Sequence, residues 1–195
     1  MRVQQGDAKM TPEAFFAWIS GRDARYELVG GDVVMMAGAG RRHDTIVTNL
    51  IAKIRPQTRG GPCQTFTGDT FIATGTMSRR MPDMGIDCGT PSDDSLLADR
   101  PALIVEVLSP TTRSFNVSVK LAEYKTLPSL HYILFVDTEY PSVQLFWRDT
   151  DGLWMDAVLD GLEAQVEFAR LNVSISLAEI YDEISFRPKP KLVEE

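Results

Sequence analysis

Two almost unbroken apolar runs dominate the hydrophobic pattern of the chain, PALIVEVLSP at 101–110 and HYILFVD at 131–137. A strand with one face in solvent alternates apolar and polar side chains, whereas a strand covered on both faces is apolar at nearly every position. Both runs therefore predict buried central strands of a sheet.

The segment between these runs has the spacing of a helix. In SFNVSVKLAEYKTL, residues 114–127, the side chains of Val117, Leu121 and Tyr124 fall on one helical face, and Ser114 is the expected N-cap. A strand, a helix and a second buried strand in this order predict a right-handed βαβ crossover, with the two strands parallel.

The rest of the chain shows shorter periodic segments, bounded by glycine, proline and polar residues. Helical spacing and strand alternation both occur, so the predicted fold class is α/β, with a mixed β-sheet flanked by helices and additional antiparallel strands. We expect helices over residues 12–20, 43–55 and 177–184, a hairpin around Gly30 and Gly31, paired strands around Gly68, a strand opened by Pro82, and short antiparallel strands between residues 142 and 176.

Length and composition favour one domain in a reducing compartment. The chain has 195 residues, of which 44% are hydrophobic, so we expect a single domain over residues 1–186 and a disordered charged tail over 187–195. No apolar run approaches the roughly 20 residues that span a bilayer, and the N-terminus lacks the apolar segment of a signal peptide. We therefore expect a cytoplasmic protein without a membrane partner, in which the isolated Cys63 and Cys88 are free thiols.

Charge is distributed unevenly along the chain. The net charge of −7 argues against a nucleic-acid partner, yet residues 41–80 carry +5 while residues 121–195 carry −8. The basic segment is either a phosphate-facing surface or a solvated arginine-rich face. Arg41 and Arg42 stand at the start of the helix expected from His43, and a helix N-terminus is a natural seat for phosphate.

Glu106 is the one carboxylate inside the run 101–110. Burying an unpaired carboxylate is unfavourable, so this side chain either pairs with a cation, lies exposed on an edge strand, or reaches a cleft near the end of its strand. Asp83 opens a predicted strand that could pair with the strand of Glu106. Two carboxylates with room for water suit Mg²⁺ better than a softer metal.

Two further charged residues have competing interpretations. Lys120, on the helix after the Glu106 strand, could reach the two carboxylates, or it could be a solvated lysine bonded to Glu123 or Asn116. Glu27 stands between Tyr26 and Leu28 on a hairpin strand, where strict alternation makes it a surface residue.

Several other site types have little support. GAGRRH at 38–43 begins like a dinucleotide-binding loop, but His43 replaces the third glycine and no acidic ribose ligand follows. The chain offers two histidines and no serine in a GxSxG turn for a nucleophilic triad. A carboxylate-pair glycosidase stays open, although no aromatic cluster accompanies either acid.

The order of these motifs resembles the Uma-two family of restriction-type endonucleases, within the PD-(D/E)XK nuclease superfamily. The likeness covers about residues 12–185, nearly the whole chain. It runs through YELVGGDVVMM, RRHDTIVTNLIAKIRP, PDMGID and LIVEVLSPTT to KLAEYKTLPSLHYILFVD. It implies a restriction-endonuclease-like core.

The resemblance also implies the site. Glu27, Asp83, Glu106 and Lys120 would be the catalytic residues, and Mg²⁺ or Mn²⁺ would be held by Asp83, Glu106 and the backbone carbonyl of Val107. The superfamily lysine usually stands two residues after the second acid, where this chain has a leucine, so Lys120 would supply the ammonium from the helix instead. Arg41, Arg42 and His43 would contact nucleic acid.

The implied function is a Mg²⁺-dependent DNA endonuclease that hydrolyses phosphodiester bonds. A homodimer is expected, because cutting both strands requires two sites. The alternative is a nuclease-fold protein that binds nucleic acid or a protein partner without cutting. The acidic overall charge and the leucine at position 108 favour this alternative.

Overall fold

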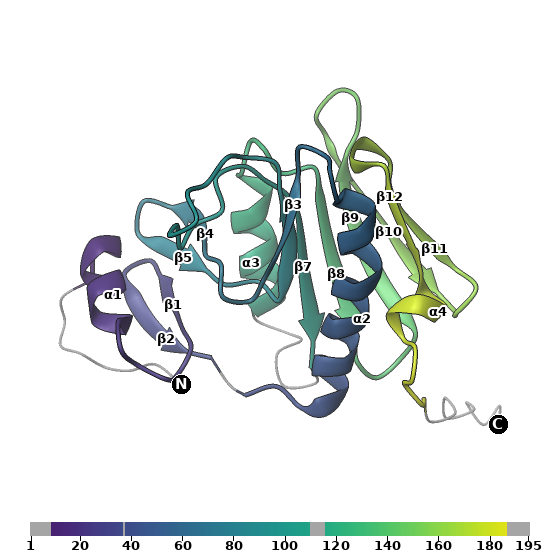
Figure 1. Cartoon of the computed structure of the whole chain (residues 1–195), viewed down its shortest axis with the longest axis horizontal. Helices are drawn as coiled ribbons and strands as arrows, with labels where there is room; N and C mark the ends of the chain where they lie inside the picture. Colours follow the sequence, from purple (N-terminus) through teal and green to yellow (C-terminus); the bar gives the residue numbers. More distant parts are fainter. Residues whose placement is uncertain (1–8, 37, 110–115, 187–195) are drawn as a thin grey trace, which may run out of the picture.

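The computed structural model of the protein describes residues 9–36, 38–109 and 116–186 (Figure 1). The expected Ser114 cap and the charged tail at 187–195 lie outside these residues. The helices and strands are α1 (Pro12–Ile19), β1 (Tyr26–Val29), β2 (Asp32–Met35), α2 (Arg41–Thr58), β3 (Gln64–Thr67), β4 (Ile72–Gly75), β5 (Ser78–Arg80), β6 (Met84–Asp87), β7 (Pro101–Leu108), α3 (Asn116–Lys125), β8 (Tyr132–Asp137), β9 (Ser142–Arg148), β10 (Trp154–Asp160), β11 (Gln165–Phe168), the 3₁₀ turn η1 (Ala169–Leu171), β12 (Val173–Ser176) and α4 (Leu177–Ile180).

A six-stranded mixed sheet carries the two apolar runs at its centre. Its strand order is β10-β9-β8-β7-β6-β3, and β7 pairs in parallel with β8, whereas the other neighbours pair antiparallel. Both central strands are buried along almost their whole length. The two predicted buried strands and their parallel pairing through an intervening helix are therefore confirmed.

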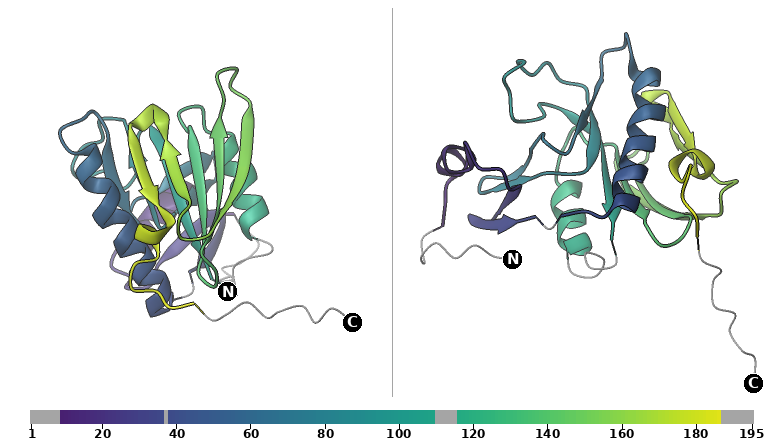
Figure 2. Two further views of the ribbon diagram at one scale, coloured as in Figure 1. Left: turned by 90° about the vertical axis from the view of Figure 1, so that its right-hand side faces the viewer. Right: turned by 60° about the horizontal axis from the view of Figure 1, so that its bottom comes forward.

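Helices cover both faces of this large sheet (Figure 2, right). On one face, α2 packs against β7 side chains that include Leu103 and Val105. On the other face, Tyr124 of α3 packs in a cluster with Ile104 of β7 and Ile133 of β8. Because successive side chains of a strand point to opposite faces, Glu106 shares the α3 face with Ile104.

A second, four-stranded sheet in the order β2-β1-β5-β4 lies beside α3, together with α1 (Figure 1). Phe15 of α1, Leu28 of β1 and Phe71 pack into its own small core. The predicted hairpin of β1 and β2 is confirmed. Gly30 and Gly31 have φ of 56° and 85°, the left-handed values that a two-residue hairpin turn requires at both positions.

The expected pairing of strands around Gly68 is wrong. The strands on either side of this glycine exist, but β3 pairs with β6 in the large sheet and β4 pairs with β5 in the small sheet. A turn signal between two short strands predicts a hairpin only when no longer-range partner competes. Here the segment around Gly68 connects the two sheets instead.

The prediction of two free thiols is also wrong, because Cys63 and Cys88 form a disulfide. The two residues flank the antiparallel pair of β3 and β6, in which Gln64 lies opposite Asp87. That register brings the two cysteine Cα atoms to 4.0 Å, although 25 positions separate them in the sequence. Neither cysteine has a short-range partner motif, so spacing alone could not reveal the pair.

The described parts of the chain contain no helix with both the length and the apolar character needed to cross a membrane.

Candidate functional site

Glu106 lies near the carboxyl end of β7, on the face that α3 covers. Its flanking residues Val105 and Val107 point to the opposite face and are buried against the α2 side. The apolar run therefore fixes the backbone on both sides of the carboxylate, and the Glu106 side chain itself is only 7% exposed. The edge-strand alternative for Glu106 is excluded, because β7 is a central strand.

The Glu106 carboxylate accepts hydrogen bonds from two side chains of α3. Lys120 Nζ lies 2.8 Å from Oε1 and 3.0 Å from Oε2, and the Tyr124 hydroxyl donates to Oε1 at 2.5 Å. Burial raises the pKa of Glu106 to about 7, and the charge of Lys120 opposes this shift. The Glu106 carboxyl group therefore holds its proton to a higher pH than an exposed glutamate does.

Lys120 bridges two carboxylates from different sheets. In addition to Glu106, its ammonium contacts Glu27 Oε1 at 3.1 Å. Burial works to lower the pKa of Lys120, but the two carboxylates outweigh it and the pKa lies above its ordinary value. The alternative of a solvated lysine is therefore wrong, because the helix turns this side chain inward onto the sheet.

Glu27 is buried, with only 5% of its surface exposed, so the expectation of a surface residue from alternation is wrong. Its strand β1 belongs to the small sheet. Alternation assigns the Glu27 face of β1 to solvent, but α3 covers this face in the folded chain. Glu27 accepts from Met81 N at 3.0 Å and from Arg80 Nη1 at 3.1 Å. Burial works to raise its pKa, but Lys120 and Arg80 outweigh it and hold the pKa below its ordinary value.

Arg80 and Glu123, neither of them predicted from the sequence to belong to the site, extend the cluster. The buried Arg80 guanidinium donates to both carboxylate oxygens of Glu123, at 2.7 Å each, and Thr74 Oγ1 donates to Glu123 Oε2 at 2.8 Å. Glu123 belongs to α3, whereas Arg80 and Thr74 belong to the small sheet. This bidentate ion pair therefore joins α3 to the small sheet immediately beside Glu27.

Asp83 lies alongside the Glu106 segment of β7. Its Oδ2 accepts from Val107 N at 2.7 Å, and its Oδ1 contacts His43 Nε2 at 3.2 Å. The strand that Asp83 precedes, β6, pairs antiparallel with β7, as expected. Burial works to lower the pKa of His43, but the Asp83 carboxylate outweighs it and raises the pKa above its ordinary value.

The two arginines at the start of α2 have different surroundings. Arg42 donates to the backbone oxygens of Thr138 and Ser185, at 3.0 Å and 2.9 Å. Its guanidinium therefore ties two segments to α2, the one that follows β8 and the one that follows α4. Arg41 is exposed at the first position of the same helix. Of the pair, Arg41 has the more accessible side chain.

The possible metal ligands in this cluster are carboxylate oxygens, which suit a hard cation better than a softer metal. Three carboxylates, from Glu27, Glu106 and Glu123, contact Lys120 or Arg80, and Asp83 is bonded to Val107 N beside them. Among the described residues no group of three or more histidine, cysteine, aspartate or glutamate side chains could hold a metal ion. Magnesium is commonly bound through one or two carboxylates and several waters, and Asp83 and Glu106 would be the two carboxylates for such a site at this end of β7.

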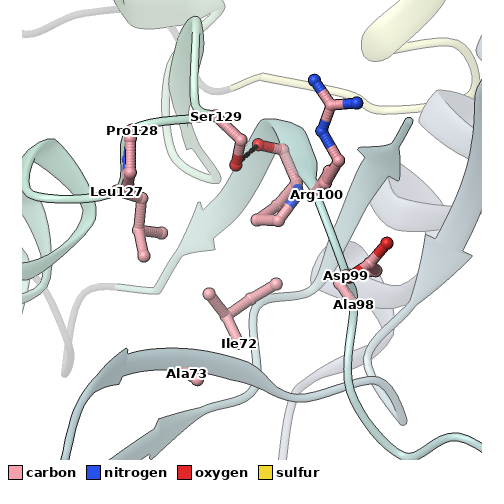
Figure 3. A pocket seen from close by; sticks show the side chains of 9 residues that line it. Ile72, Ala73, Ala98, Asp99, Arg100, Leu127, Pro128 and Ser129 are labelled. Carbon is pink, nitrogen blue, oxygen red and sulfur yellow. Dashed lines mark hydrogen bonds between the residues drawn. The ribbon is translucent and has the colours of Figure 1, made fainter. Parts of the chain in front are cut away.

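An open pocket lies at the other end of β7, away from this cluster (Figure 3). It begins at Pro101, the first residue of the strand, whereas Glu106 lies near the last. None of the charged residues described above lines it. Its walls come from β4, the segment before β7 and the turn after α3, and are formed by Ile72, Ala73, Ala98, Asp99, Arg100, Pro101, Leu127, Pro128 and Ser129.

Two residues of the cluster were not predicted from the sequence, and only Tyr124 had a usable signal. Tyr124 is four positions after Lys120 on a predicted helix, and residues at that spacing share a face. Tyr124 was therefore placed correctly on the buried face, but its hydroxyl was not assigned to Glu106. Arg80 had no such signal, because its contacts to Glu27 and Glu123 span 53 and 43 positions.

Comparisons with known proteins identify the family and the fold. The sequence pattern of the Uma2 family, described as "Putative restriction endonuclease", matches residues 12–178. Two proteins of Synechocystis sp. (strain ATCC 27184 / PCC 6803 / Kazusa) are similar, both described as uncharacterized. The protein slr1290 is 25% identical over 181 residues, covering 91% of this chain and 94% of its own length. The protein sll1609 is 28% identical over 152 residues, covering 75% and 85%.

One solved structure has the same fold. It is described as "a putative nuclease belonging to DUF820" from Anabaena variabilis ATCC 29413, and it superposes with a TM-score of 0.71 at 15% identity, over 88% of this chain and 97% of that one. At this identity the likeness shows the fold alone. The predicted fold class, a mixed sheet flanked by helices with a restriction-endonuclease-like core, is confirmed.

Proposed function

The chain belongs to the Uma2 family, and on that premise we propose that it is a metal-dependent endonuclease that hydrolyses phosphodiester bonds of DNA. Family and fold support a nuclease. The observation that carries the proposal is the arrangement of Lys120, which lies 2.8 Å from Glu106 and 3.1 Å from Glu27, both buried. Burying a lysine between carboxylates near the end of a strand costs desolvation free energy, so stability alone does not explain it. Such clusters of buried charges are typical of active sites.

Asp83, Glu106 and the backbone carbonyl of Val107 would hold Mg²⁺ or Mn²⁺. The hydrogen bond from Val107 N to Asp83 brings the Asp83 carboxylate to this part of β7. Bound there, the ion would stabilise the charge that develops on the phosphate and acidify a water. His43 supports the site by fixing the other oxygen of Asp83.

Lys120 would orient the attacking water. Its ammonium contacts both oxygens of Glu106, which places the positive charge beside any ligand of that carboxylate. Glu27 already accepts the ammonium at 3.1 Å and is itself fixed by Arg80 and Met81 N. We therefore assign Glu27 to holding Lys120 in the site, because its two oxygens already accept these donors.

Arg41 would contact the DNA backbone at the start of α2, next to the His43 that holds Asp83. Arg41 is exposed there, and backbone N–H groups at a helix N-terminus favour phosphate. Arg42 would act indirectly, since its guanidinium is bonded to two backbone oxygens.

A second candidate function is binding of nucleic acid without cleavage. It is favoured by the Lys120 ammonium, which contacts both oxygens of Glu106, and by a pKa of about 7, which leaves this carboxylate partly protonated at neutral pH. A protonated carboxyl group is a poor ligand for magnesium.

Plasmid nicking combined with calorimetric Mn²⁺ binding separates the two functions. We expect nicking that requires Mg²⁺ or Mn²⁺, and we expect Asp83→Asn and Glu106→Gln each to abolish Mn²⁺ binding and reduce nicking by about 100-fold or more. Glu27→Gln should retain Mn²⁺ binding and reduce nicking. Nicking that survives both Asp83→Asn and Glu106→Gln would overturn the proposed site.

The matched control is Glu167→Gln, which neutralises an exposed carboxylate on β11, outside the cluster. It should leave both Mn²⁺ binding and nicking unchanged. If Mn²⁺ binds with the predicted residue dependence and DNA binds but is never cut, the second candidate function replaces the first.

A further inference from the structure

The strand β10 forms one edge of the large sheet and carries an unusual share of exposed apolar surface. It pairs with β9 on one side, and no other described strand pairs with its second side. The β9–β10 hairpin lies at the margin of the sheet, to the right of the left-hand view in Figure 2. Four of the six large hydrophobic side chains that are exposed in the described chain lie here: Leu153 (63% exposed), Met155 (45%), Val158 (58%) and Leu162 (44%).

The free side of β10 has a defined set of hydrogen-bonding groups. Asp149 N donates to Leu153 O, and Gly161 N donates to Pro141 O, so both contacts join odd-numbered residues of the two strands. In an antiparallel ladder, hydrogen-bonded pairs alternate with non-bonded pairs. With Ala157 opposite Leu145, the odd-numbered residues of β10 therefore face β9, and the even-numbered residues direct their N–H and C=O groups outward.

We propose that β10 pairs antiparallel with β10 of a second copy of this chain, so that the two large sheets join across a two-fold axis at Ala157. The outward N–H and C=O groups of β10 pair with no other strand in the part of the chain that the structure describes. Such an edge is a template for pairing, and a two-fold axis lets the same strand serve both partners. The proposal concerns assembly and does not depend on nuclease activity.

The acidic residues of β10 select this register. With Ala157 opposite Ala157 of the partner subunit, Asp156 faces Val158 of the partner subunit, and Asp160 faces Trp154 of the partner subunit. Shifting the axis to Val158 puts Asp156 opposite Asp160 of the partner subunit, and shifting it to Asp156 puts this residue opposite its own copy. Like charges directly opposite each other are destabilising. Of the three central registers that pair outward-facing residues, only the axis at Ala157 avoids such a contact.

A second copy fits this edge because the strand complements itself. In the selected register, Met155 lies opposite Leu159 of the partner subunit on one face of the joined sheet, so an exposed apolar side chain meets another apolar side chain. Val158, exposed in the single chain, is covered by the neighbouring strand. The same register therefore pairs the outward backbone groups, which have no partner among the described residues, and gives Met155 an apolar neighbour.

Two charge variants at one position test the register in the full-length protein. Sedimentation velocity over a concentration series should show a monomer–dimer equilibrium. Val158→Asp places an acid opposite Asp156 of the partner subunit twice per dimer, and should raise the dimer dissociation constant by about tenfold. Val158→Lys forms two opposite-charge pairs instead, and should lower the constant, an effect that high salt removes.

The outcomes are distinguishable. A wild-type chain that stays monomeric at every attainable concentration overturns the proposal. Equal weakening by Val158→Asp and Val158→Lys would mean a hydrophobic contact without this register, and no effect of either would place the interface elsewhere. Circular dichroism and thermal unfolding check that both variants fold, which is expected because Val158 is exposed and points its backbone N–H away from β9.

A cysteine substitution on the axis gives a second, independent measurement. Ala157→Cys places two thiols opposite each other in a non-hydrogen-bonded pair, where side chains are closest, so mild oxidation should link the two copies. Leu159→Cys is the matched control, because it faces Met155 of the partner subunit. A covalent dimer from Ala157→Cys alone supports the axis. Linking that is equal for both variants, or absent from both, contradicts it.

Discussion

The large and the small sheet each contribute one buried glutamate to the same cluster, and the two glutamates behave in opposite ways. Glu106 of the large sheet and Glu27 of the small sheet are buried to nearly the same extent, and Lys120 contacts both. Yet the pKa of Glu106 is raised to about 7, whereas the pKa of Glu27 is lowered. Equal burial therefore does not fix the charge state.

The difference comes from the neighbours that each sheet supplies. Glu27 receives a guanidinium from Arg80 and a backbone N–H from Met81, both close to it in the small sheet, in addition to Lys120. Glu106 shares Lys120 and adds the neutral hydroxyl of Tyr124, while the charges of two other carboxylates raise its pKa further. Additional cationic and N–H donors keep Glu27 ionised. Glu106, with fewer such donors, keeps a pKa above its ordinary value.

The largest expected effect on stability comes from removing Arg80, which stabilises the ionised form of Glu27. Arg80→Met leaves Glu27 and Glu123 buried with fewer partners, and removing one partner of a buried ion pair destabilises a protein by about 3–5 kcal/mol. Denaturant unfolding should show a loss of this size. Arg59→Met, at an exposed position after α2, is the control and should change stability by less than about 0.5 kcal/mol. An equally stable Arg80→Met protein would contradict the buried network.

Neutralising each glutamate in turn should have opposite effects on stability as pH changes. The folded pKa of Glu106 is above its ordinary value of 4.5, so the folded state keeps a proton that the unfolded chain releases. Stability therefore falls as pH rises from about 4.5 to 7, by an amount of the order of 3 kcal/mol, and Glu106→Gln should remove this fall. Unfolding measured at pH 5 and pH 7.5 checks it.

For Glu27 the sign is reversed. Its folded pKa is below 4.5, so it contributes stability above that pH and loses the contribution as pH falls through the folded pKa. Glu27→Gln should lower stability at pH 7.5 by about 2 kcal/mol, and the difference from wild type should shrink in acid. If both variants change the pH dependence in the same direction, the contrast between the two sheets is wrong.

The smallest expected effect comes from Tyr124→Phe, which removes the hydroxyl that contacts Glu106 at 2.5 Å and keeps the ring in its cluster. Stability should fall by about 1 kcal/mol, and the pKa of Glu106 should rise further, because a donor to its charged form is lost. Carboxyl titration by NMR, with Glu106→Gln to assign the signal, measures the shift. An unchanged or lowered pKa would contradict the role of the hydroxyl.

The centre of the large sheet and its carboxylate were predictable from sequence because they depend on local pattern. An eight-residue apolar strand, a helix and a second apolar strand predict a parallel pair, and Glu106 stands out against its neighbours. The helical spacing of Val117, Leu121 and Tyr124 predicted the buried face of the helix, whereas it left Lys120 open between the site and solvent. The resemblance to the Uma-two family then gave Asp83 and Lys120 a shared role, and the structure brings both to the Glu106 segment of β7.

The small sheet was less predictable, because its important features depend on what lies next to it. Alternation along β1 gives Glu27 a solvent face, and α3 covers that face in the folded chain. The segment around Gly68 has the local pattern of a hairpin, yet its strands pair into separate sheets. Arg80 has neighbours that lie 43 and 53 positions away, which no local period encodes.

By itself, the sequence determined the fold class, the buried parallel strands and the placement of one carboxylate among apolar residues, since each follows from side-chain periods of two and 3.6 residues. The tertiary structure decided which charges meet. It joined Cys63 to Cys88 and placed Lys120 between Glu27 and Glu106. The physical reason is that electrostatic energies in a buried cluster depend on distances across sheets and helices, and these distances exist only once the chain has folded.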